Sequence, residues 1–177
     1  MPFFTPDRIF SRFCELTPEY LLSRGIRGLL LDMDNTLIPY EEELPTAEIT
    51  AFIRSMQENG IGVALVTNNR KRRLLRFNES LALPAFSFSV KPLPHNLWRA
   101  ARRLSVKPSE CALMGDQLLT DMLGARLAGM TSFIVPPIRD KQKRLIRLKR
   151  RIERPLVRRY RKKNPCDAEI GTATWKK

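Results

Sequence analysis

Long apolar runs, cysteine and signal-peptide features are all scarce or absent in this chain of 177 residues. No stretch of about 18 apolar residues occurs, so we expect no transmembrane helix. The three cysteines (Cys14, Cys111 and Cys166) lie far apart and match neither a metal-ligand spacing nor a disulfide framework. We therefore expect free thiols in a reducing compartment. The opening sequence MPFFTPDRIFSRF lacks a basic leader before a long apolar block, so it does not predict a secretory signal.

Acidic residues are scarce in one segment in particular. Residues 139–163 contain fourteen Lys and Arg residues and two acids, so they carry a net charge of +12 out of +14 for the whole chain. The basic charge therefore belongs to an appended element, and the rest of the chain is close to neutral. Hydrophobic residues make up 43% of the chain, which is enough for a packed core and excludes a disordered protein.

Apolar runs alternate with helical patterns over residues 25–138. We expect buried strands at 28–33, 61–66, 86–90, 111–114 and 132–135, and helices at 45–59, 71–83, 96–104 and 121–128. Strands and helices that alternate at this spacing form a parallel sheet covered on both faces. The predicted fold is a three-layer, Rossmann-like α/β fold with a five-stranded, mostly parallel sheet.

Residues 1–24 predict two short helices. Thr5 and Thr17 are each followed by proline and an acid, a pattern typical of a helix start. Apolar residues at helical spacing follow, and two alternatives stay open: the apolar face packs on the core, or it lies on a membrane surface. These residues are Ile9, Phe10, Phe13 and Leu16.

Polar side chains follow four of the predicted strands. Because the carboxyl ends of parallel strands meet at one edge of a sheet, we expect these side chains to converge there. Paired carboxylates fit Mg²⁺, whose remaining positions water and phosphate can fill, while a lysine and a hydroxyl can bind the phosphate. One carboxylate can attack phosphorus, and an acid two residues later can protonate the leaving alkoxide. The residues are Asp32 and Asp34, then Thr67 and Asn68, then Lys91, then Asp116 and Asp121.

Four motifs built on these residues resemble those of the haloacid dehalogenase (HAD) superfamily. They are DMDNT at 32–36, VTNN at 66–69, VKP at 90–92 and GDQLLTD at 115–121, in the order that the superfamily uses. More narrowly, LDMDNTL, VTNN, KPLP and MGDQLLTD resemble the YqeG family of subfamily IIIA phosphatases. That family is similar to the mitochondrial phosphatidylglycerophosphate phosphatases.

The resemblance implies a role for each residue. Asp32 would be the nucleophile, and Asp34 would be the general acid and base with its backbone carbonyl on Mg²⁺. Asp121 would support the metal through water or hold Lys91, and Asn68 would be a turn residue or a further substrate contact. The implied substrate-binding residues are Thr67, Asn68 and Lys91, and the implied metal-binding residues are Asp32, Asp34, Asp116 and Asp121.

The spacing of the motifs leaves no room for a cap domain. Asp34 and Thr67 are separated by 32 residues and Thr67 and Lys91 by 23, and the expected strands and helices use both stretches. An open site suits a phosphate carried on a large surface, since enzymes of small metabolites generally need to exclude water.

The segment 139–163 predicts a basic, amphipathic helical tail. Leu145, Leu148 and Ile152 form an apolar stripe among Lys and Arg, which is typical of binding to an anionic membrane surface. Packing of this tail on the sheet is the alternative. We expect residues 164–177 to be disordered.

The sequence therefore predicts a Mg²⁺-dependent phosphomonoester hydrolase, cytoplasmic and bound peripherally to the inner face of the membrane. By the resemblance, it converts phosphatidylglycerophosphate, a phosphorylated lipid, to phosphatidylglycerol. Two alternatives stay open. One is a phosphatase of nucleic-acid ends, because a basic segment attracts any polyanion; the other is an RNA- or ribosome-binding protein that keeps the site as a relic.

Overall fold

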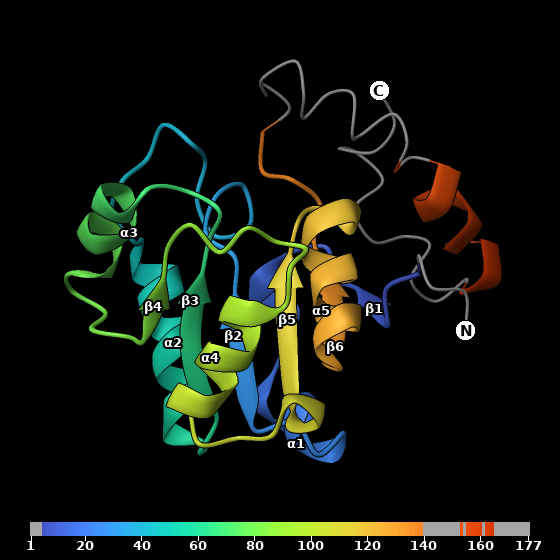
Figure 1. Cartoon of the computed structure of the whole chain (residues 1–177), viewed down its shortest axis with the longest axis horizontal. Helices are drawn as coiled ribbons and strands as arrows, with labels where there is room; N and C mark the ends of the chain where they lie inside the picture. Colours follow the sequence, from blue (N-terminus) through green and yellow to red (C-terminus); the bar gives the residue numbers. More distant parts are fainter. Residues whose placement is uncertain (1–4, 140–152, 154, 161, 165–177) are drawn as a thin grey trace.

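The computed structural model describes residues 5–139, 153, 155–160 and 162–164. Its centre is one parallel sheet with the strand order β1–β6–β5–β2–β3–β4 (Figure 1). The predicted parallel α/β sheet is confirmed, but it has six strands rather than five. The strands are β1 (Arg8–Ile9), β2 (Gly28–Leu31), β3 (Gly62–Val66), β4 (Ala85–Phe86), β5 (Cys111–Gly115) and β6 (Thr131–Ile134).

Helices cover both faces of the sheet, so the fold has three layers. Alternate residues of a strand face opposite sides: Leu29 and Leu31 of β2 pack in one hydrophobic cluster, while Leu30 packs in another. The first cluster includes side chains of α1 (Pro18–Ser23), α2 (Ala47–Glu58) and α3 (Lys71–Asn78). The second includes side chains of α4 (His95–Arg103) and α5 (Leu123–Ala128), which lie in front of the sheet in Figure 1. Short 3-10 turns cover Phe13–Glu15 and Pro108–Glu110.

The expected first helix, after Thr5, is wrong, and the edge strand β1 stands in its place. The acid that resembled a helix-start residue binds the neighbouring strand instead: the Asp7 carboxylate accepts hydrogen bonds from the backbone N–H and the hydroxyl of Ser132, both at 2.8 Å. Asp7 also pairs with Arg126 at 3.0 Å. These contacts fix the chain in an extended form parallel to β6.

The apolar residues after β1 pack in the core. Phe10, Phe13 and Leu16 are buried, and the Phe10 ring meets Phe133 of β6 edge to face at 5.5 Å between ring centres. Of the two alternatives for this face, packing on the core is the one that the structure has, and a membrane-facing position is wrong. The second expected helix is present as α1, and the Thr17 hydroxyl caps it by accepting from the backbone N–H of Tyr20.

Two helix boundaries differ from the expected ones by three residues or more. Helix α3 ends at Asn78 rather than near residue 83, because the Asn78 side chain bonds both the N–H and the carbonyl of Leu83. The helix expected from Asp121 begins earlier, as one turn of π-helix at Leu118–Met122, labelled η3, that continues into α5.

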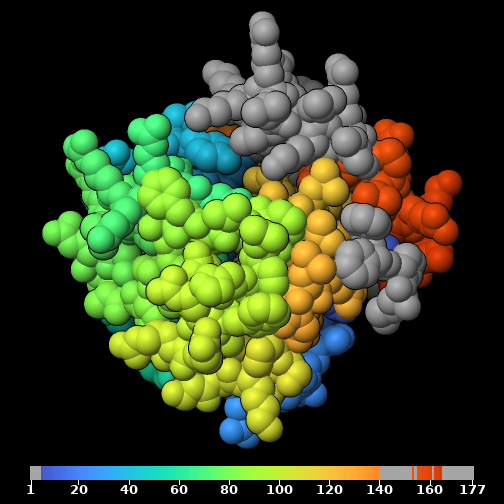
Figure 2. Space-filling view, in the orientation of Figure 1, coloured from blue at the N-terminus to red at the C-terminus, as the bar shows by residue number. Residues whose placement is uncertain are grey.

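Part of the basic tail packs on the flank formed by β1 and β6. Glu153 and residues 155–160 and 162–163 are helical, and Figure 2 shows the described tail residues, in red, at this side of the molecule. Val157 and Tyr160 are buried against four core residues, namely Ile9, Leu118, Met122 and Ile134. The predicted apolar stripe of Leu145, Leu148 and Ile152 lies outside the described residues, as does the predicted disordered segment apart from Asn164.

Two further expectations concern the described residues. None of the helices in these parts of the chain is long and apolar enough to cross a bilayer. Cys14 and Cys111 are free thiols, as expected, while Cys166 lies outside the residues that the structure describes.

Candidate active site

The sheet brings two of the predicted acids together at its carboxyl edge. Leu31 of β2 lies opposite Met114 of β5, and the backbone N–H of Asp32 continues the ladder by donating to the Met114 carbonyl at 2.9 Å. Asp32 and Asp116 therefore leave adjacent strands at the same level. Buried apolar runs place both carboxylates at the end of the sheet, where they need a polar partner or a cation.

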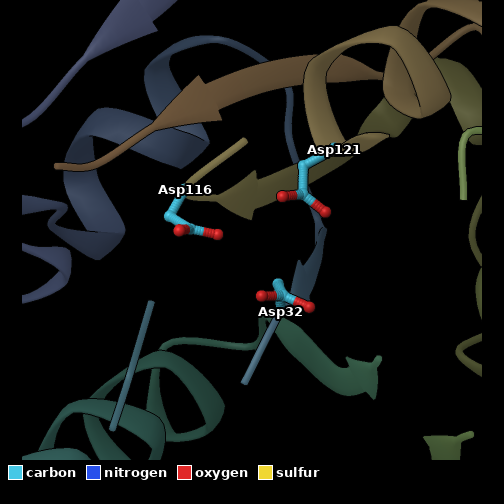
Figure 3. Close-up of side chains that lie close together, drawn as sticks. All are labelled: Asp32, Asp116 and Asp121. Atoms are coloured by element: carbon cyan, nitrogen blue, oxygen red, sulfur yellow. The ribbon is translucent and has the colours of Figure 1, made fainter. Parts of the chain in front are cut away.

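The π-helical turn returns Asp121 to the same place. Asp32, Asp116 and Asp121 are buried, and one carboxylate oxygen from each lies within 4.8 Å of the others. Figure 3 shows the three carboxylates facing a common space. The backbone N–H of Gln117 donates to Asp121 at 3.1 Å. A Cβ atom on Gly115 would overlap the Asp121 side chain, so glycine is needed before Asp116.

Lys91 links two of these acids. Its ammonium lies 2.7 Å from an Asp32 oxygen and 2.6 Å from an Asp121 oxygen, and it donates to the Val66 carbonyl at 2.9 Å. Contact with Asp121 is one of the two roles expected for that acid. Burial disfavours the charged lysine, but Asp121 and Asp32 outweigh it and raise the pKa of Lys91 above its ordinary range.

The electrostatics of the cluster favour an added cation. Burial raises the pKa of Asp32 well above its ordinary value; Lys91 opposes this shift, and Asp121 and Asp116 add to it. Three carboxylates around one ammonium leave two formal negative charges, which a divalent cation would balance. Hard oxygen ligands at this spacing suit Mg²⁺. The residues present therefore fit the expected metal, with Asp32, Asp116 and Asp121 as side-chain ligands.

Asp34 belongs to a second polar group beside the cluster. Its carboxylate accepts from the Thr67 hydroxyl at 3.3 Å, from the Asn69 amide at 3.0 Å and from Nε of Arg73 at 2.6 Å. The Arg73 and Asp34 side chains are only 15% and 7% exposed. Arg73 also donates to the Pro39 carbonyl at 3.1 Å, so it joins α3 to the loop after β2.

Sequence reasoning missed Asn69 and Arg73. Asn69 directly follows Thr67 and Asn68, two predicted residues of the second motif, and this position in the motif could have identified it as a site residue. Arg73 lies in the basic run RKRRLLR, where nothing distinguishes it from its exposed neighbours. Arg73 lies three residues after Arg70, the N-cap of α3, and is therefore in the first turn of the helix. Only the three-dimensional structure shows that this residue contacts Asp34.

Two asparagines hold the loops of the site. The Asn68 side chain accepts from the backbone N–H of Lys91 at 2.8 Å and donates to the Lys91 carbonyl at 3.2 Å, so it fixes the lysine-bearing loop.

Asn35 has a left-handed backbone (φ 66°), a conformation that asparagine adopts more readily than most residues. Its amide forms a reciprocal pair of hydrogen bonds with the backbone of Arg139. The Thr36 hydroxyl donates to Asp32 at 3.2 Å.

All seven predicted residues thus come to one edge of the sheet. Asp32, Asp116, Asp121 and Lys91 form the acid cluster with its ammonium, while Asp34 and Thr67 form the adjacent group. Asn68 bonds the backbone of Lys91 in this structure, and its predicted contact with substrate stays a prediction, as do the individual catalytic roles.

Comparison with known proteins gives the family. Residues 37–129 match the family of haloacid dehalogenase-like hydrolases. The chain is 34% identical over 161 residues to a Bacillus subtilis protein named "Probable phosphatase YqeG", covering 91% of this chain and 94% of that protein. It is also 29% identical over 105 residues to a glyceraldehyde 3-phosphate phosphatase of Pyrococcus furiosus, covering 54% of this chain and 43% of that protein.

The fold has relatives among solved structures. A cobalt-bound deoxy-D-mannose-octulosonate 8-phosphate phosphatase of Haemophilus influenzae superposes with a TM-score of 0.52 at 19% identity, over 63% of this chain and 69% of that one. This likeness concerns the fold alone. The family match and the B. subtilis relative agree with the acid cluster at the sheet edge: the chain belongs to the haloacid dehalogenase-like hydrolases, as a phosphatase with a YqeG homologue.

Proposed function

We propose that this phosphatase hydrolyses phosphatidylglycerophosphate to phosphatidylglycerol and phosphate at a membrane surface. The observation that carries the phosphomonoester chemistry is the buried acid cluster with Lys91 between Asp32 and Asp121. The lipid substrate rests on the resemblance of the motifs to YqeG-type phosphatases.

In the proposed reaction, an Asp32 oxygen attacks phosphorus while the bond from phosphorus to the glycerol oxygen breaks. The leaving alkoxide takes a proton from Asp34, which gives the lipid alcohol and an aspartyl-phosphate on Asp32. Asp34 then removes a proton from water, whose oxygen attacks phosphorus and releases inorganic phosphate and the Asp32 carboxylate. Bound Mg²⁺ would neutralise charge on the phosphoryl oxygens and on the acid cluster.

The contacts of Asp34 suit this work. Thr67 and Asn69 donate to one oxygen of its carboxylate and Arg73 donates to the other, so the acid is oriented before substrate arrives. Lys91 is positioned by its own contacts with the Val66 carbonyl and with Asn68. Pre-orientation of this kind contributes to rate because little reorganisation is left for the reaction step.

The chain between the motifs supports a large substrate. Residues 35–66 hold a loop, α2 and β3, and residues 68–90 hold α3, β4 and loops; each of these helices and strands belongs to the core. Nothing in these two described stretches forms a separate domain over the acid cluster. This arrangement supports the proposal that a phosphate presented by a bilayer reaches the edge of the sheet.

Phosphate release tests the proposal. Purified protein with Mg²⁺ should release phosphate from phosphatidylglycerophosphate in mixed micelles, and the Asp32→Asn variant should not. A DNA 3′-phosphate at matched ionic strength is the comparison substrate, because exposed basic residues also attract nucleic acid. Faster phosphate release from the DNA 3′-phosphate would indicate a nucleic-acid substrate and contradict the lipid substrate. Activity retained by Asp32→Asn would contradict the role of Asp32 as nucleophile.

A further inference from the structure

Three apolar side chains next to the acid cluster face solvent. Phe88, Val90 and Leu93 are 58%, 61% and 58% exposed, and we call them the apolar rim. They alternate with buried polar residues of the same loop: Ser89 is 3% exposed and Lys91 is 5% exposed. The loop that sends the lysine inward to Asp32 thus sends apolar groups outward.

This exposure does not come from a loosely held loop. The backbone N–H of Phe88 donates to the Asn69 carbonyl at 3.1 Å, that of Ser89 to Thr67 at 3.0 Å, and that of Leu93 to Val90 at 3.0 Å. The Ser89 hydroxyl adds a bond to the Phe86 carbonyl at 3.0 Å. The loop is therefore anchored to the segment that follows β3, and its outward side chains are fixed by the fold.

The backbone of the loop is unusual for the residues that it carries. Phe88 and Val90 have φ angles of 46° and 51°. Bulky and β-branched residues rarely adopt this left-handed region, where glycine or asparagine would be less strained. Such conformations concentrate at functional sites. The strain here coincides with two large apolar side chains directed to water on either side of the buried Ser89 and next to Lys91.

Basic residues border the apolar rim. Asn69, which accepts from the Phe88 N–H, is followed by Arg70, Lys71 and Arg72, all exposed at the start of α3. The acidic loop after β2 offers less opposing charge than its composition suggests, because Glu43 pairs with Arg76 at 2.8 Å and Glu41 with Arg139 at 3.4 Å. An apolar patch bordered by cations complements an anionic lipid surface, because each basic residue near that surface strengthens the attraction.

We propose that the apolar rim inserts into the interface of an anionic bilayer, so that the acid cluster is held against the lipid head groups. The rim deepens the proposed lipid function and rests on it. Figure 1 shows the strands pointing to the edge that carries this loop, and Lys91 lies between Val90 and Leu93 in the chain. Membrane contact therefore comes from the loop that binds the phosphate, rather than from the buried N-terminal aromatic residues.

Vesicle binding is the first test. The triple variant Phe88→Asn, Val90→Asn, Leu93→Ser removes the rim, and asparagine tolerates the left-handed backbone. Its binding to vesicles of equal parts phosphatidylcholine and phosphatidylglycerol should fall roughly tenfold or more, since burial of apolar surface is lost. The matched control is Leu22→Ser, which replaces a leucine 45% exposed on α1, away from the site; it should bind like the wild type. Unchanged binding of the triple variant would overturn the proposal.

The charge of the patch gives a second arm. Lys71→Gln with Arg72→Gln should weaken binding to the same vesicles and leave binding to pure phosphatidylcholine vesicles nearly unchanged. The control pair is Arg102→Gln with Arg103→Gln, which are exposed at the end of α4 that precedes β5. Equal effects of the two pairs would indicate unspecific attraction and contradict a basic border at the rim.

A probe that keeps the rim apolar guards against damage to the fold. In Leu93→Trp, brominated lipids in the anionic vesicles should quench the added tryptophan fluorescence, whereas in Leu22→Trp they should not. No quenching at position 93 would overturn the insertion. Stronger binding of wild-type protein to single-stranded RNA than to vesicles, lost in the triple variant, would instead assign the rim to base stacking.

The outcomes separate the rim from the substrate. If the wild type releases phosphate from phosphatidylglycerophosphate and the triple variant binds vesicles normally, the membrane role of the apolar rim is contradicted and the proposed lipid substrate is supported. If the triple variant loses vesicle binding and the wild type hydrolyses no lipid, the proposed substrate is contradicted and the membrane role of the apolar rim is supported. Hydrolysis of the soluble ester p-nitrophenyl phosphate reports in each case that the acid cluster is intact.

Discussion

Arg73 should support Asp34 strongly enough for the effect to be measured in unfolding experiments. Arg73→Met removes the guanidinium and keeps an unbranched, apolar side chain. The variant loses a charge-assisted bond to Asp34 at 2.6 Å, worth about 1.5–3 kcal/mol, and a bond to the Pro39 carbonyl, worth about 0.5–1.5 kcal/mol. Both side chains of the ion pair are mostly buried, so we expect a total loss of about 2–4.5 kcal/mol in the free energy of unfolding.

A double-mutant cycle isolates the contact between the two residues. In the Asp34→Ala background the contact with residue 34 is already absent, so Arg73→Met loses the bond to the Pro39 carbonyl and its cost should fall to about 0.5–1.5 kcal/mol. Urea unfolding followed by circular dichroism measures all four proteins. Arg76→Met is the matched control one turn later: its partner is Glu43, both side chains are about half exposed, and its cost should stay below about 1 kcal/mol.

Activity separates positioning from stability. Because Arg73 orients Asp34, Arg73→Met should lower kcat for p-nitrophenyl phosphate by about 100-fold with a smaller change in KM. Arg73→Lys, which keeps a cation, should recover part of that loss. If Arg73→Met cost the same free energy in both backgrounds, or left kcat unchanged, Arg73 would not act through Asp34.

Three further predictions concern the acid cluster and the tail. Asp32→Asn should lower phosphate release at least about 10³-fold while Tm stays the same or rises, because one charge leaves a crowded cluster; a large fall in Tm in differential scanning fluorimetry would contradict this. Chelation should abolish activity, and Mg²⁺ at about 100 times its Kd should raise Tm by about 5–10 °C in the wild type but not in Asp116→Asn; equal shifts would exclude Asp116 as a ligand. Val157→Ala should cost about 1–3 kcal/mol in urea unfolding, since Val157 is buried on the β1 and β6 flank, whereas an unchanged midpoint would show that the tail does not pack there.

Sequence patterns predicted the strands of the core because each strand is marked by its own run of apolar residues. Strands such as β2 and β5 are continuous apolar runs, and the acids that follow them cannot continue a buried strand. Five of the seven predicted site residues directly follow β2, β3 or β5, and parallel pairing explains why these five meet, whereas a loop brings in Lys91 and the π-helical turn brings in Asp121. The π-helical start at Leu118 was not predicted, because its function is to return Asp121 over Gly115, a contact between residues six apart in sequence.

Long-range partners account for what the sequence did not predict. Thr5, Pro6 and Asp7 read as a helix start because the partner of Asp7, Ser132, is 125 residues away. Arg73 reads as one more surface cation in a basic run, and only its distance to Asp34 distinguishes it. The apolar rim was also unpredicted: in sequence, Phe88 and Val90 extend an apolar strand, whereas in the structure β4 ends at Phe86.

The pairing of β1 with β6 has a consequence for biosynthesis. Of the six strands, the one translated earliest lies beside the one translated latest, and it meets no other strand. On the ribosome, Ile9 is made long before its packing partners Leu118, Met122 and Ile134. A nascent chain at that stage exposes apolar side chains that the folded protein buries. We expect chaperones to shield these side chains until β6 has left the exit tunnel.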